Sequence, residues 1–133
     1  GIGLSPDGSQ LYVAETPTGR LWSFEIKEPG VLQKQKKIVP WEKGKLIASP
    51  EGYHLFDSLA LDSLGNICVG SIPGKIDVFS ATGEHIDRIL LPDIFPTNIC
   101  FGGPELDKAF ITLSSTGKLI SMKWATKGLA LNF

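Results

Sequence analysis

Two oxygen-bearing side chains precede short apolar stretches of the sequence and are the first candidates for chemistry. Asp57 stands two positions before the apolar residues 59–61, and Asn98 directly precedes residues 99–101. Carboxylate and amide oxygens are ligands that hard divalent cations prefer, and a carboxylate can also act as a general base. Asp57 is therefore a candidate metal ligand or catalytic residue; the alternative is an Asx-type turn that leads into a strand.

Short apolar or alternating runs, separated by turn residues, surround these candidates and are typical of β-strands. Gly 15 and Pro 9 in a chain of 133 residues argue against a helical bundle. No run predicts a helix longer than two turns, and residues 33–37 are expected to form an exposed outer strand or a loop. The predicted strands are residues 11–14, 20–26, 67–69, 75–79, 110–113 and 118–122.

One arrangement of strands recurs three times along the chain. In each copy a strand is followed by a turn, a glycine, a basic residue and a second strand; the pairs are Gly19-Arg20, Gly74-Lys75 and Gly117-Lys118. A short strand precedes each copy, at residues 2–4, 59–61 and 99–101, and a fourth strand follows the first two copies near residues 37–39 and 86–90. Units of this kind are typical of β-propeller blades.

We therefore predict an all-β fold, a β-propeller of which this chain forms about three blades. The repeat units are expected to cover approximately residues 1–56, 57–96 and 97–133. A β-sandwich of about ten strands is the alternative, although a sandwich does not need the same order of elements to recur. Because a propeller ring typically needs four or more blades, we expect further sequence or a second copy of the chain to complete it.

The innermost strands of a propeller line its central channel, so residues at their ends are expected to meet a ligand. This places Asp57 at a channel mouth as metal ligand and catalytic residue, with Asn98 nearby as a substrate-binding residue. Glu15, at the end of a strand in the first unit, is predicted to project toward the channel and bind substrate; simple solvent exposure is the alternative. His54 lies in a loop predicted to fold over the channel and bind substrate; the alternative is a surface histidine.

Charge and hydropathy exclude several classes of partner. Lys+Arg 13 against Asp+Glu 14 gives a net charge of -1 without a basic block, so neither nucleic acid nor an anionic membrane is an expected partner. No apolar stretch approaches the roughly 18 to 20 residues that cross a bilayer, and no signal peptide is recognisable at the start. The missing initial Met suggests a piece of a longer protein.

The two cysteines indicate the redox compartment. Cys68 and Cys100 are each flanked by apolar residues, which predicts reduced thiols buried in strands rather than a disulfide or a metal cluster. A reducing compartment is favoured, and the cytoplasm is the predicted location.

Several stretches resemble one protein family. Residues 1–8, 11–16 and 18–22 look like the middle of the SMP-30/gluconolactonase/luciferin-regenerating-enzyme-like family. Residues 56–60, 97–106 and 128–133 resemble its C-terminal half, in order and across essentially the whole chain. The resemblance implies a six-bladed propeller that binds one divalent cation, calcium or zinc, and hydrolyses a sugar lactone such as gluconolactone.

The same resemblance implies a role for Asp57. In the family the cation is held by a Glu near the N-terminus, by an Asn just before a glycine like Gly1, and by an Asp at the position of Asp57; only the Asp is present here. Asp57 would also activate water while the cation polarises the lactone carbonyl. Ser58 stands where the family often has Gly. The alternative function is a non-catalytic propeller module that binds a small sugar-like ligand or calcium.

Overall fold

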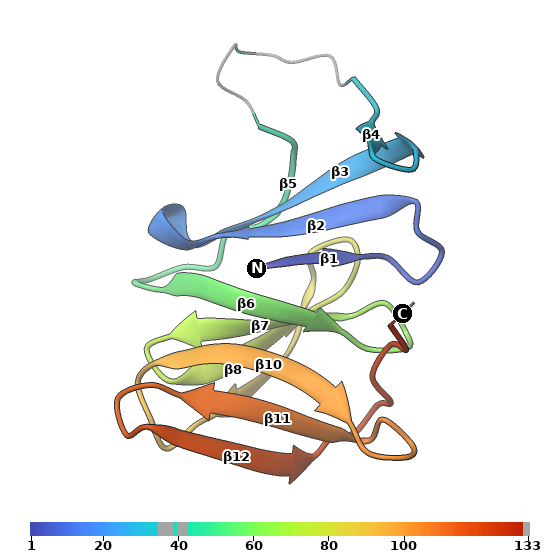
Figure 1. The fold of residues 1–133 in the computed structure, drawn as a ribbon. Coiled ribbons are helices and arrows are strands. Elements are labelled where there is room, and N and C mark those ends of the chain that lie inside the picture. Colours follow the sequence, from blue (N-terminus) through green and yellow to red (C-terminus); the bar gives the residue numbers. More distant parts are fainter. Residues whose placement is uncertain (35–38, 40–42, 132–133) are drawn as a thin grey trace.

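Turn residues divide the chain into three antiparallel sheets, which a computed structural model shows for residues 1–34, 39 and 43–131 (Figure 1). In the sheets most strand pairs join strands consecutive in sequence, and we call the sheets blades 1 to 3. The described residues contain no α-helix, and the 3-10 turn η1 (Thr16–Thr18) follows β2. No helix in the described part of the chain is long and apolar enough to cross a membrane.

The strands begin and end close to the predicted positions. Blade 1 holds β1 (Ile2–Leu4), β2 (Gln10–Glu15), β3 (Arg20–Glu28) and β4 (Val31–Leu32), and β5 (Lys45–Ala48) also pairs with β3. Blade 2 holds β6 (Leu55–Leu61), β7 (Ile67–Ile72), β8 (Lys75–Phe79) and β9 (His85–Leu90). Blade 3 holds β10 (Pro96–Gly102), β11 (Lys108–Leu113) and β12 (Lys118–Lys123).

The first strands of successive blades lie beside one another, since β6 contacts both β1 and β10. One apolar cluster joins blades 1 and 2 around Leu21, Phe56 and Phe79, and a second joins blades 2 and 3 around Ile76 and Ile111. Stacked blades with adjoining inner strands are the arrangement of a propeller, so the predicted fold class is confirmed and the sandwich alternative is wrong.

One expectation about the cysteines is wrong, and one expected strand lies mostly outside the described residues. Cys68 is buried on β7 as predicted, but Cys100 is exposed, because it points away from the neighbouring buried Ile99 on β10. Both thiols are free. The strand expected near residues 37–39 falls mostly outside the described residues, whereas the one expected near 86–90 is β9. The predicted boundaries of the repeat units stay a prediction; the one between 56 and 57 falls within β6.

Candidate functional site at the entry of the inner strands

The inner strands β1, β6 and β10 begin at one end of the blades, which we call the entry face. The pairings Ile2↔Val13, Leu55↔Ile72 and Pro96↔Leu113 place the first residue of each inner strand opposite the last part of its neighbour. The turns that follow β2, β7 and β11 therefore also lie at the entry face. All four residues predicted to form the site, which are Glu15, His54, Asp57 and Asn98, are at this end of the fold.

A β-bulge interrupts both β6 and β10 where the candidate residues stand. In β6 the register shifts between Phe56 and Leu59, so Asp57 and Ser58 share a single opposing residue, Gly70. In β10 the shift lies between Pro96 and Asn98. An extra residue breaks the strict alternation of a strand and re-aims its side chains. The bulges thus release Asp57 and Ser58 in β6, and Thr97 in β10, from the regular alternation, and Asn98 is the first residue after the β10 bulge.

Glycines let the inner strands approach closely at these bulges. A Cβ atom on Gly1 would lie 2.6 Å from the Asp57 carbonyl oxygen and 2.7 Å from the Leu59 nitrogen. A Cβ atom on Gly70 would lie 3.0 Å from the Pro96 carbonyl oxygen and 3.5 Å from that of Ser58. Only a glycine fits such an approach without displacing the neighbouring backbone, so these two positions hold the three inner strands together around Asp57.

Asp57 and Asn98 are brought into one neighbourhood by Ser58. The Ser58 hydroxyl Oγ donates a hydrogen bond to the Asn98 side-chain oxygen Oδ1, which links the inner strands of blades 2 and 3. Asp57 is half-buried and Asn98 is exposed. The carboxylate of Asp57 belongs to no ion pair among the described residues. A half-buried carboxylate and an exposed carboxamide therefore both belong to the entry face, and Ser58, the neighbour of Asp57, bonds to the carboxamide.

Glu15 makes its polar contacts within blade 1 and with Lys43, which directly precedes β5. Its oxygen Oε2 accepts hydrogen bonds from Thr18 Oγ1 at 2.7 Å and from Trp22 Nε1 at 2.9 Å, and Oε1 pairs with the Lys43 ammonium. The Lys43 contact, followed by Thr18 and Trp22, lowers the pKa of Glu15 from its ordinary 4.5 to about 2. Both oxygens therefore hold the edge of blade 1, and substrate binding by Glu15 stays a prediction.

His54 is a buried residue, so the surface-histidine alternative is wrong. Its ring atom Nε2 lies 3.0 Å from the Gly19 carbonyl oxygen, and its ring packs on Phe56 with the centroids 5.3 Å apart. A carbonyl oxygen only accepts, so Nε2 carries the proton in this contact. His54 thus fastens the turn after β2 to the start of β6, next to Asp57. Its predicted role in binding substrate stays a prediction.

A residue that sequence reasoning missed, Asp93, anchors the segment between blades 2 and 3. Its carboxylate accepts hydrogen bonds from Phe95 N at 2.8 Å and from the backbone and hydroxyl of Thr116 at 2.8 and 2.7 Å. Burial opposes ionisation of Asp93, but the bonds from Phe95 and from Thr116 prevail and lower the pKa to about 2. The sequence signal that could have identified Asp93 is its position two residues before Phe95, the spacing of an Asx-turn in which the Asp side chain accepts from the backbone N–H two residues on. Asp93 supports the entry to β10, where Asn98 stands.

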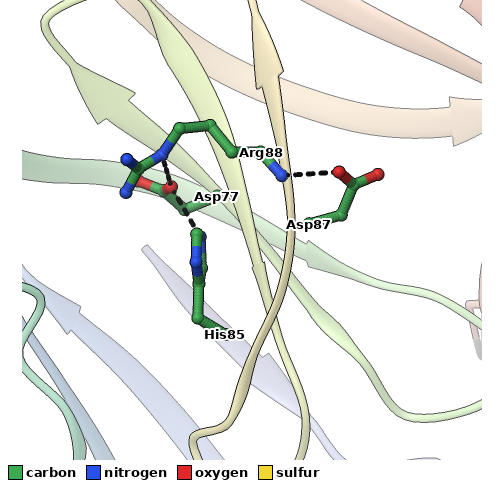
Figure 2. Close-up of polar contacts among 4 residues, drawn as sticks. All are labelled: Asp77, His85, Asp87 and Arg88. Atoms are coloured by element: carbon green, nitrogen blue, oxygen red, sulfur yellow. Dashed lines mark hydrogen bonds and ion pairs between the residues drawn. The ribbon is translucent and has the colours of Figure 1, made fainter.

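A second polar cluster lies on blade 2, away from these residues (Figure 2). The buried carboxylate oxygen Oδ1 of Asp77 accepts from Arg88 Nε at 2.7 Å and lies 2.9 Å from His85 Nε2. Burial raises the pKa of Asp77, but the donors, led by Arg88, outweigh it and lower the pKa overall. Arg88 and His85 line an open cleft of about 440 Å³ against residues 47–51, and neither Asp57 nor Asn98 borders it.

The oxygen atoms at the entry face determine whether a divalent cation fits there. Asp57 offers carboxylate oxygen, the donor type that calcium favours. Asn98 Oδ1 already accepts a hydrogen bond from Ser58. No group of three or more His, Cys, Asp or Glu side chains suited to a metal ion occurs among the described residues. Asp57 therefore fits as one ligand of a cation whose remaining ligands are not supplied by the described part of the chain.

The family is decided by comparison with known proteins. The model of the SMP-30/Gluconolactonase/LRE-like region matches residues 1–115. The chain belongs to this family. It is 31% identical to the 6-deoxy-6-sulfogluconolactonase of Pseudomonas putida over 120 residues, which are 86% of this chain and 37% of that protein. It is also 31% identical to the diisopropyl-fluorophosphatase of Loligo vulgaris over 121 residues, 90% of this chain and 36% of that protein.

A solved structure agrees with the fold. The calcium-binding protein regucalcin of Agrobacterium tumefaciens superimposes with a TM-score of 0.74 at 20% sequence identity, covering 98% of this chain and 46% of that chain. At this identity the likeness concerns the fold. The chain thus spans little more than a third of the two curated relatives and forms part of the propeller of its SMP-30/gluconolactonase-like family.

Proposed function

We propose that this chain is part of a divalent-metal-dependent hydrolase that opens sugar lactones, with Asp57 at its centre. The observation that carries the proposal is the close approach of the three inner strands around Asp57 and Ser58, where the Asp57 carboxylate remains free of ion pairs among the described residues and Ser58 bonds to Asn98. Membership of a family that includes a sugar lactonase supports this substrate class.

Hydrolysis requires a water oxygen to bond to the lactone carbonyl carbon while the ring C–O bond breaks. In the proposal, the carboxylate of Asp57 accepts the proton that the attacking water loses, and that proton is then available to the ring oxygen that leaves. The product is the open hydroxy acid. A divalent cation, calcium or zinc, would be held in part by Asp57 and would supply Lewis-acid polarisation of the carbonyl. The calcium-binding protein regucalcin, which shares this fold, is consistent with such an ion.

A non-catalytic module that binds a sugar-like ligand or calcium is the second candidate, because a carboxylate and a carboxamide can hydrogen-bond to the hydroxyls of a polyol without any reaction. A cytoplasmic location is proposed along with the enzyme, supported by the two free thiols, Cys68 and Cys100. A small-molecule substrate is the expected partner, with a homo-oligomer as one way to complete the ring.

The test is acid release from gluconolactone above its spontaneous rate, with calcium or zinc added to the full-length protein. We expect metal-dependent turnover and a loss of roughly 10²- to 10⁴-fold in kcat/KM for Asp57→Asn, because the amide cannot accept the proton. The matched control is Asp87→Asn on the exposed strand β9, which keeps an acceptor for the Arg88 backbone and should retain full activity. A folded protein without turnover on a panel of sugar lactones would favour the binding module.

A further inference from the structure

The hydrogen bond between Ser58 and Asn98 determines which end of the Asn98 carboxamide is available. Ser58 Oγ donates to Oδ1, so the carbonyl end of the amide is directed at blade 2. The other end, Nδ2, carries two N–H donors. No hydrogen bond from Nδ2 to another described residue is formed, and the Asn98 side chain is exposed at the entry face. The amide therefore presents donors, and not an acceptor, to a small molecule at the entry face.

The backbone around the pair makes this orientation specific. Ser58 stands in the β6 bulge and Asn98 directly follows the β10 bulge, and Gly70 lies close to the backbone carbonyls of both Pro96 and Ser58 at the boundary between blades. The neighbouring hydroxyl of Thr97 is engaged elsewhere, with Thr112 at 3.0 Å and Ser114 at 2.7 Å. Among these described hydroxyls, Ser58 is thus the one that bonds to the carboxamide. A hydroxyl that fixes a neighbouring side chain reduces the entropy lost when that side chain binds a ligand.

We propose that Ser58 is a positioning residue that holds Asn98 so that its Nδ2 donates to a hydroxyl oxygen of a polyhydroxylated lactone. This inference rests on the proposed lactone hydrolysis and adds the specificity determinant: a sugar lactone in preference to an unsubstituted one. The assignment to a hydroxyl follows from the chemistry of the site, because the reacting carbonyl lies with Asp57 and the cation in that proposal. A neutral amide that binds a remote hydroxyl contributes to substrate binding more than to the chemical step.

The test compares gluconolactone with δ-valerolactone, which lacks ring hydroxyls, on the full-length protein and its variants. For gluconolactone we expect Ser58→Ala and Asn98→Ala each to raise KM about 3- to 10-fold, the worth of one hydrogen bond, with little change in kcat. For δ-valerolactone neither variant should change KM. Ser58→Thr keeps the hydroxyl and should restore the KM of the wild type. Ser121→Ala, on the exposed face of β12, is the matched serine control and should leave both substrates unaffected.

A double variant separates positioning from an independent contact. If Ser58 acts through Asn98, then Ser58→Ala adds nothing to KM in the Asn98→Ala background. Additive effects, equal effects on both lactones, or an unchanged KM for gluconolactone would overturn the positioning role. The absence of turnover in the wild type would instead refute the lactonase on which the role depends, so the two failures are distinguishable.

Discussion

Removing Arg88 should expose the cost of the carboxylate buried in blade 2. The Asp77 side chain is 1% exposed, and Arg88 Nε and His85 Nε2 both contact its oxygen Oδ1, whereas Oδ2 has no hydrogen-bond partner among the described residues (Figure 2). In Arg88→Leu this carboxylate loses its arginine partner and keeps the contact of Oδ1 with His85 Nε2. Leaving a buried charge without its partner is strongly destabilising, because the attraction to that partner offsets the cost of removing the charge from water.

The expected loss of stability in Arg88→Leu depends on how exposed the Arg88 side chain is. Breaking a fully buried pair costs about 3 to 5 kcal/mol, but the Arg88 side chain is 41% exposed, so water can enter the vacated space. We therefore expect Arg88→Leu to lower the free energy of unfolding by about 2 to 3 kcal/mol. Urea unfolding followed by tryptophan fluorescence at pH 7 measures the change, and an unchanged m-value shows that the folded and unfolded states keep their compactness.

Two further variants make the interpretation refutable. Adding Asp77→Asn to Arg88→Leu removes the stranded charge and should recover about 1 kcal/mol, which is a coupling between neighbours in one network. Lys127→Leu breaks the surface pair with Glu105, whose side chains are 61% and 68% exposed, and should have no measurable effect on unfolding. A loss below about 0.5 kcal/mol for Arg88→Leu, or a double variant no more stable than the single one, would refute the argument from buried charge.

Two other predictions concern stability. The pKa of Glu15 falls from 4.5 to about 2 on folding, so its contact with Lys43 stabilises the fold above pH 4.5 and this stabilisation is lost as the pH falls toward 2. Urea unfolding at several pH values between 2 and 4.5 measures the free energy of unfolding. This free energy should depend less on pH in Glu15→Gln than in the wild type. Gly83 and Gly30 both have positive φ angles, +92° and +79°, but only at Gly83 would an added Cβ collide with a neighbour, the Ile47 carbonyl group. Gly83→Ala should therefore lower the midpoint of thermal unfolding clearly more than Gly30→Ala. Equal losses for the two variants would contradict this prediction.

The strands were predictable because their signals are local. Alternating side chains and turn glycines determine a meander over a few residues, and its repetition indicated blades and their inner strands. The orientations of Glu15 and His54 were not predictable in the same way. Glu15 is held by Lys43, which is distant in sequence, and His54 by the Gly19 carbonyl oxygen on another blade. Such contacts depend on how the blades pack against one another, and the alternation of side chains along a single strand does not predict them.

The bulges that build the candidate site do leave a trace in the sequence. In an uninterrupted strand, buried residues are two apart, yet Phe56 and Leu59 are both buried with two polar residues between them. Pro96 and Ile99 repeat the pattern in β10. An apolar pair three apart, enclosing two polar residues at the start of an inner strand, thus marks a bulge. The enclosed residues are Asp57 with Ser58 and Thr97 with Asn98, so the feature that breaks strand alternation also places the site's polar side chains at the entry face.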